Sequence, residues 1–141
     1  MKRFVYYILV YLLMPGNLAL ADSDIDDARI QLKNYGLANC IVGQFKSDSD
    51  VKSDINLAIG AYSPMGAGKY IIEQNEDTLE IIYNPYIETK KFVLSAYKKT
   101  RSIFKSSGDQ NVFHSCLQIY NSDEFDQFIK AQDKYLSHAP A

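Results

Sequence analysis

Cysteine and histidine are the residue types through which this chain could carry out nucleophilic or metal chemistry, and it has only two of each. Cys40 and Cys116 are far apart in the sequence, His114 lies beside Cys116, and His138 lies near the C-terminus. A thiolate with one of these histidines as its base would be a catalytic nucleophile. Two cysteines in an oxidising compartment would instead form a disulfide. The choice therefore depends on where the protein resides.

The first 21 residues predict that the chain is exported. A basic start, Lys2-Arg3, precedes an unbroken apolar run over residues 4–14, and the small residues of Ala19-Leu20-Ala21 come directly before Asp22. These are the three parts of a secretory signal peptide. The apolar run is about half the roughly 20 residues that a membrane-spanning helix needs. We therefore predict cleavage after residue 21 and a periplasmic protein without membrane attachment.

Export favours the disulfide over the nucleophile. Cys40 and Cys116 are the only cysteines of the chain, and periplasmic thiols are oxidised. Cys116 also lies in an apolar helical pattern, and apolar surroundings raise the pKa of a thiol and make it unreactive. We predict a Cys40–Cys116 disulfide that stabilises the fold by about 4 kcal/mol, because it closes a long loop.

No other motif points to catalysis, a metal or a cofactor. Residues 66–69 read Gly-Ala-Gly-Lys, but Tyr70 stands where a phosphate-binding loop has Ser or Thr, so we interpret residues 64–68 as a hinge. Asp123 and Glu124 suit the start of a helix better than acid–base catalysis. Histidines and cysteines do not show the spacing of metal ligands. The prediction is a protein that is not an enzyme and has no catalytic residue, metal or cofactor.

The charge of the chain argues against nucleic-acid binding. It has 15 basic and 17 acidic residues and a net charge of −2, which becomes more negative when Lys2 and Arg3 are removed. Its longest basic clusters are the pairs Lys90-Lys91 and Lys98-Lys99. A nucleic-acid-binding surface needs a larger basic patch. Binding to another protein is the better prediction.

Apolar residues recur at helical spacing along most of the chain after residue 21. Together with N-cap signals such as Asn84-Pro85, they predict helices over residues 22–46, 51–62, 85–104, 112–120 and 122–135. Residues 70–72 and 78–83 predict either a small hairpin or a distorted helix. Gly36 and Gly43 mark either a tight helix crossing or weak points in the first helix. The fold prediction is a single domain over residues 22–141, an all-α bundle of five to six helices with one disulfide.

Several local features follow from this pattern. Asn121 and Glu124 resemble a capping box, the tail is expected to fray from Ser137, and residues 105–111 are entirely polar with a central glycine, which predicts an exposed loop. The third helix should bury one stripe of side chains, namely Tyr86, Val93, Tyr97 and Phe104. The fourth helix is defined by the residues Val112, Phe113, Cys116, Leu117 and Tyr120.

The stretch from Lys91 to Lys130 resembles a known family. A long amphipathic helix and a polar loop are followed by V-F-H-S-C-L-Q-I-Y-N-S-D-E-F-D-Q-F-I-K, and residues 34–40 read N-Y-G-L-A-N-C. This pattern is similar to that of the immunity proteins of type VI secretion amidase effectors, the fourth such family. The positions that carry the match are Cys116, Leu117, Ile119, Tyr120, Asn121, Ser122, Glu124 and Phe125. Residues 64–83 depart from the family pattern.

The resemblance implies a periplasmic, helical, disulfide-bonded homodimer that binds a peptidoglycan amidase and occludes its active site with a protruding loop. The effector-binding loop would consist of Lys105, Ser106, Ser107, Gly108, Asp109, Gln110 and Asn111. The same loop reads equally well as a solvated connector. Tyr86 or Tyr97 would add contacts with the enzyme if they were exposed.

Two other functions are compatible with the sequence. The first is a periplasmic adaptor or small-ligand binding protein without a toxin partner. The second, with less support, is a small hydrolase whose site has no recognisable motif. A cognate amidase effector would distinguish an immunity protein from both.

Overall fold

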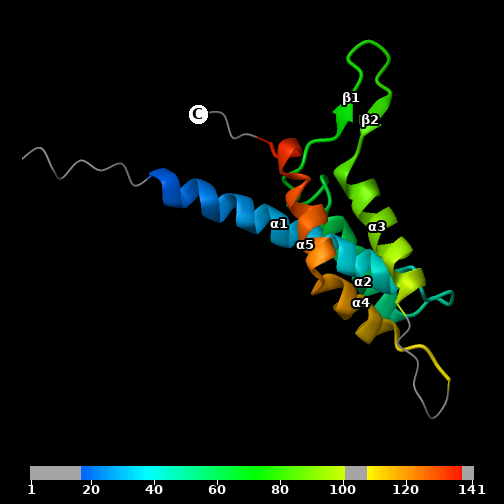
Figure 1. Cartoon of the computed structure of the whole chain (residues 1–141). Helices are drawn as coiled ribbons and strands as arrows, with labels where there is room; N and C mark the ends of the chain where they lie inside the picture. The colour runs from blue at the N-terminus through cyan, green and yellow to red at the C-terminus, as the bar shows by residue number, and fades with distance from the viewer. Residues whose placement is uncertain (1–16, 101–107, 138–141) are drawn as a thin grey trace, which may run out of the picture.

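The computed structural model describes residues 17–100 and 108–137 of the chain. Its central element is α1, Asn17–Val42, which contacts each of the other four α-helices in the described part of the chain. Figure 1 shows the C-terminal part of α1 among the other helices, while its N-terminal end projects away from them. Ala28, Leu32 and Cys40 recur at whole turns along its buried side, as expected of a helix that packs on several neighbours. The helix begins earlier and ends earlier than the predicted range of residues 22–46, since its bounds are Asn17 and Val42.

Gly36 in α1 and Gly43 directly after its last residue mark a tight helix crossing, which is one of the two alternatives that the sequence predicted. A Cβ atom on Gly36 would lie 2.7 Å from Cζ of Phe125 and 3.1 Å from Cγ2 of Thr89. A Cβ atom on Gly43 would lie 2.6 Å from Cδ2 of Leu94. Glycine at these positions lets neighbouring helices approach α1 more closely than any other residue would allow.

The second helix, α2 (Asp50–Tyr62), begins where the sequence predicted. The side chain of Ser49 caps it by accepting a hydrogen bond from N of Lys52 at 3.2 Å. The helix packs on α1, yet none of its side chains is buried, and Val51 and Leu57 are exposed. Apolar side chains of α2 therefore face solvent.

Residues 64–68, predicted as a hinge, form a hydrogen-bonded turn. N of Ala67 donates to O of Ala61 at 2.7 Å, and N of Gly68 donates to O of Ser63 at 3.0 Å. A Cβ atom on Gly68 would lie 2.2 Å from Oη of Tyr86. Glycine at this position thus serves the close approach of the turn to α3.

A small antiparallel hairpin follows. It is one of the two structures that the sequence predicted for this segment, the other being a distorted helix. Strands β1 (Glu73–Gln74) and β2 (Ile81–Tyr83) pair Glu73 with Tyr83 and Gln74 with Ile81. Between them, Oδ1 of Asn75 accepts hydrogen bonds from N of Asp77 and N of Thr78, both at 2.9 Å. The β-branched residues on one side of this polar turn favour a strand.

The third helix, α3 (Pro85–Lys99), starts at the predicted residues. The side chain of Asn84 accepts hydrogen bonds from the first helical amides, and Pro85 occupies the first helical position. Tyr86, Val93 and Tyr97 are buried, as predicted for its apolar stripe. Phe104, the fourth predicted member of that stripe, lies outside the described residues.

The helices α4 (Val112–Tyr120) and α5 (Asp123–Lys130) are joined by a short turn. The capping box expected from Asn121 and Glu124 does not form, because the cap lies one residue later. Oγ of Ser122 accepts from N of Phe125 at 3.2 Å. The side chain of Asn121 instead donates to O of Leu117 at 2.9 Å and so stabilises the end of α4.

The last helix is shorter than predicted, because α5 ends at Lys130 and a 3₁₀ turn, η1 (Asp133–Tyr135), replaces its last turns. Contacts with residues far away in the sequence draw the chain out of the helix. O of Tyr135 accepts from N of Ile71 at 2.7 Å. N of Ser137 donates to O of Lys69 at 2.9 Å, so the expected fraying does not begin at Ser137.

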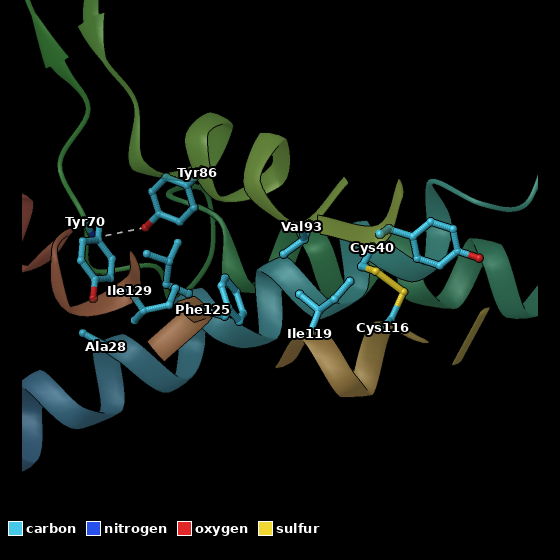
Figure 2. Close-up of a cluster of buried hydrophobic side chains, with 11 residues drawn as sticks. Ala28, Cys40, Tyr70, Tyr86, Val93, Cys116, Ile119, Phe125 and Ile129 are labelled. Atoms are coloured by element: carbon cyan, nitrogen blue, oxygen red, sulfur yellow. Dashed lines mark hydrogen bonds between the residues drawn. A yellow bond between two sulfur atoms is a disulfide. The ribbon is translucent and has the colours of Figure 1, made fainter. Parts of the chain in front are cut away.

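The described residues form the predicted all-α fold, with five α-helices, a two-stranded sheet and one disulfide. Figure 2 shows the disulfide at one end of the core and Tyr70 with Tyr86 at the other, with Phe125, Val93 and Ile119 between them. Among the helices of the described residues, none has the length and apolar character needed to cross a membrane.

Candidate functional site

The disulfide joins α1 to α4. Cys40 and Cys116 are 76 residues apart in the sequence, their Cα atoms lie 5.8 Å apart, and each residue is 1 % exposed. Because both sulfurs are bonded to each other, no cysteine of the chain is free. The predicted disulfide is confirmed, and a thiolate nucleophile with His114 or His138 as its base is excluded in this state.

The disulfide also fixes the end of the candidate effector-binding loop. Asn111, the last loop residue, caps α4: its Oδ1 accepts from N of His114 at 3.0 Å. Its carbonyl oxygen accepts from Oγ of the buried Ser115 at 2.8 Å. Cys116 follows directly in the sequence. The loop therefore leads into a short helix that is covalently attached to the core.

The structure describes the second half of the candidate loop. Gly108, Asp109 and Gln110 are exposed, whereas Asn111 is half-buried as a helix cap. Gly108 has a φ of 76°, a left-handed conformation that favours glycine. Lys105, Ser106 and Ser107 lie outside the described residues. Gly108, Asp109 and Gln110 are therefore the exposed residues in the described part of the loop.

One aromatic residue next to the loop was misassigned by the sequence pattern. Phe113 was expected on the apolar face of α4, but it is 60 % exposed. The buried stripe of α4 runs through Ser115, Cys116 and Ile119, and Phe113 lies to one side of it. Phe113 and Cys116 are three residues apart, a spacing that places two side chains on the same side of a helix, so helical spacing gave no signal that Phe113 is exposed. An exposed aromatic beside an exposed loop is a typical protein-binding contact.

The two tyrosines considered as enzyme contacts are not available for binding. Tyr86 and Tyr97 are both buried, and Oη of Tyr86 accepts a hydrogen bond from N of Tyr70 at 3.1 Å. Burial raises the pKa of both side chains above the ordinary value. They are core residues of α3.

A groove of about 700 Å³ lies between α3 and the α4–α5 pair. Phe92 and Phe128 stack in its wall with ring centroids 4.5 Å apart. Its carboxylates are Glu88, which pairs with Lys91 at 2.7 Å, and Glu124 in the first turn of α5. Neither histidine nor cysteine lines it. Within residues 17–100 and 108–137, His, Cys, Asp and Glu side chains form no cluster able to hold a metal ion.

The long-range ion pairs of the described residues gather along α1. Lys69 contacts Asp24 and lies 3.0 Å from Asp27, and Arg29 contacts Asp133 of η1. The hydrogen bond that Arg29 donates to Asp133 raises the pKa of its guanidinium, and the hydrogen bond that Lys69 donates to Asp24 raises the pKa of Lys69. These pairs hold the turn after α2 and the C-terminal segment against α1.

The comparison with known families identifies one match. A family model described as "Type VI secretion system (T6SS), amidase immunity protein" matches residues 31–129. The matched range extends from α1 to α5 and includes both cysteines of the disulfide and the candidate loop. Comparison with curated proteins and with solved structures gives no match.

Proposed function

Because the chain belongs to the amidase immunity proteins of the type VI secretion system, we propose that it binds a cognate peptidoglycan amidase and inhibits it by inserting the loop of residues 105–111 into the catalytic cleft. The family match over residues 31–129 is the observation that carries this proposal. An immunity protein acts as an inhibitor rather than as an enzyme. The match favours this function over a periplasmic adaptor or a small-ligand binding protein.

The anchoring of the loop supports its role as an inhibitor. On the C-terminal side of the loop, Asn111 caps α4, and the disulfide attaches α4 to α1. A fixed end reduces the entropy lost when a loop becomes ordered in a partner's cleft. The exposed Phe113 would pack against the rim of that cleft.

The proposed location is the periplasm, where the amidase would meet its peptidoglycan substrate. Two features of the chain support it: the signal-peptide pattern of residues 1–21 and a disulfide, which persists in oxidising compartments. The mature chain would begin near Asp22. A homodimer, which the family resemblance implies, is part of the proposal, and analytical ultracentrifugation of the mature protein would test it.

The test shortens the loop while keeping the cap of α4. Residues 105–110 are replaced by Gly-Ser, and Asn111 is retained because it caps α4. Loop length changes cost only about 0.6 kcal/mol per doubling, so the variant should fold with a nearly unchanged melting temperature. Co-expression with the amidase in the periplasm should then kill cells that the wild-type protein protects.

A matched control separates loop length from loop chemistry. Residues 105–110 are replaced by six residues of alternating Gly and Ser, which keeps the length but removes Lys105, Asp109 and Gln110. Loss of protection with both variants would assign inhibition to the loop side chains, and loss with the shortened variant alone would assign it to the reach of the loop. Full protection by a stably folded shortened variant would rule this loop out.

A further inference from the structure

The hairpin of residues 70–83 exposes large apolar side chains that the fold does not use. Leu79, Ile82 and Ile81 are 71 %, 60 % and 54 % exposed, and Ile71 is also exposed. Figure 1 shows the hairpin projecting beyond the helices. Successive side chains of a strand point to opposite faces, so Ile81 and Ile82 place apolar surface on both sides of the hairpin. Several large apolar side chains exposed on one projecting element mark an interaction site.

The base of the hairpin is attached to the core, so its tip is held in place. The Tyr83 ring stacks on Tyr135 with centroids 4.3 Å apart, and Oη of Tyr83 donates to Oε1 of the buried Gln132 at 2.8 Å. N of Tyr70 donates to Oη of Tyr86 at 3.1 Å. A projecting element held at its base binds with little loss of conformational freedom.

Leu79 at the tip adopts a backbone conformation that stability alone does not explain. Its φ is 59°, in the left-handed region where glycine and asparagine are favoured and leucine is strained. The Leu79 side chain is mostly exposed and therefore recovers little of this strain by packing. A strained, exposed apolar residue at a loop tip is typical of residues retained for binding.

The charge of the hairpin indicates the chemistry of its partner. Glu73, Glu76, Asp77 and Glu80 are exposed, and no Lys or Arg occurs between Lys69 and Lys90. Within the described residues none of these four carboxylates takes part in an ion pair. A partner surface complementary to this hairpin has an apolar depression with basic side chains around it.

We propose that the 70–83 hairpin is a second docking element for the amidase effector, binding a basic-rimmed apolar depression outside the enzyme's catalytic cleft. This inference rests on the proposed function. The hairpin precedes α3 and the candidate inhibitory loop follows it, and the 15 residues of α3 separate them by about 22 Å. Figure 1 shows the hairpin and residues 108–111 at opposite ends of the molecule. The hairpin therefore sets affinity, whereas the loop sets inhibition.

The test replaces the apolar tip with a residue that suits its backbone. Leu79→Asn removes the apolar side chain and relieves the left-handed conformation, so the melting temperature should stay the same or rise. Calorimetric titration with the purified type VI amidase of the same cell should show binding at least ten-fold weaker than that of the wild-type protein. At saturating concentration the variant should still inhibit the amidase completely, because its loop is intact.

Matched changes on α2 serve as controls. Leu57→Asn removes an equally exposed leucine and should change affinity less than two-fold. The pair Glu76→Gln and Asp77→Asn should slow association at low salt and reduce its salt dependence, whereas Asp54→Asn on α2 should not.

Three outcomes would contradict the inference. Wild-type affinity in Leu79→Asn would show that the hairpin does not dock, while the proposed function stands. Sedimentation that finds a dimer for the wild-type protein and a monomer for Leu79→Asn would assign the hairpin to a second copy of the chain instead. Failure of the wild-type protein itself to bind the amidase would refute the proposed function, and the hairpin inference with it.

Discussion

Removing the disulfide should cost a large part of the stability of this fold. The perturbation is the double substitution Cys40→Ala and Cys116→Ala, which opens a loop closed by residues 76 apart in the sequence. The loop-entropy relation gives about 4.5 kcal/mol for a loop of this length. Domains of this size are stable by about 5–15 kcal/mol in total. The melting temperature should therefore fall by roughly 15–20 °C.

The loss should be concentrated in α4. This helix has nine residues, fewer than the about 12–15 at which an isolated helix is even marginally stable, so it depends on its attachment to α1. Without the disulfide, amide hydrogens of α4 and of the adjoining loop residues should exchange faster than those of α3. Inhibition should weaken as well, because the end of the loop is no longer fixed.

The assay is urea denaturation of three samples: oxidised wild-type protein, reduced wild-type protein and the double variant. Reduced protein keeps both sulfur atoms in the core, so its difference from the double variant isolates the packing lost on substitution. Thiol titration of the oxidised protein in denaturant should find close to no free thiol. A loss below about 1 kcal/mol on reduction would refute the argument from loop entropy.

Three further predictions follow from single residues. In urea denaturation, Gly36→Ala should destabilise the fold by about 1–3 kcal/mol, because its Cβ would clash with Phe125. Gly60→Ala in α2 has open space around it and should stabilise the helix by up to about 1 kcal/mol. Tyr70→Phe should raise stability by about 1 kcal/mol, since the buried Tyr70 hydroxyl has no hydrogen-bond partner in the described structure. Burial raises the pKa of Tyr70 above its ordinary 10.0, so above pH 10 the unfolded chain ionises first and the stability of the wild-type protein should fall as the pH rises. This fall should be smaller in the variant. In calorimetric titration with the amidase, Phe113→Ala should weaken binding at least ten-fold. His114→Ala, at an exposed position beside it, should leave both binding and inhibition nearly unchanged.

Local signals in the sequence determined the ends of several elements. Asn84-Pro85 predicts a helix start that the structure has, because a capping side chain and a proline act on the amides directly after them. The disulfide was also predictable, since a chain with two cysteines allows one intramolecular pairing. The family resemblance also came from the sequence, mainly from the residues around Cys116, and the family match over residues 31–129 confirms it.

Helix faces and the C-terminal end of α5 depended on contacts between distant residues. Phe113 fits an apolar pattern in the sequence, but α4 packs on the core through Ser115, Cys116 and Ile119, and Phe113 is left exposed. The helix α5 ends at Lys130, and the chain after it forms a backbone hydrogen bond between Tyr135 and Ile71. No local signal near residue 130 predicts this helix end.

The segment of residues 70–83 shows most clearly what local sequence signals predict and what tertiary contacts decide. Its β-branched residues and polar turn were compatible with a hairpin or a distorted helix, because short apolar runs do not distinguish the two. Tertiary contacts decided: Tyr83 stacks on Tyr135 and bonds to Gln132, which holds the base of the hairpin against the C-terminal segment. The sequence by itself determined which residues cap helices and which apolar residues recur at helical spacing, since both depend on neighbours along the chain. It also determined the disulfide, since the chain has two cysteines. Only the tertiary structure decided which apolar side chains remain exposed for a partner, because exposure depends on what packs against each face.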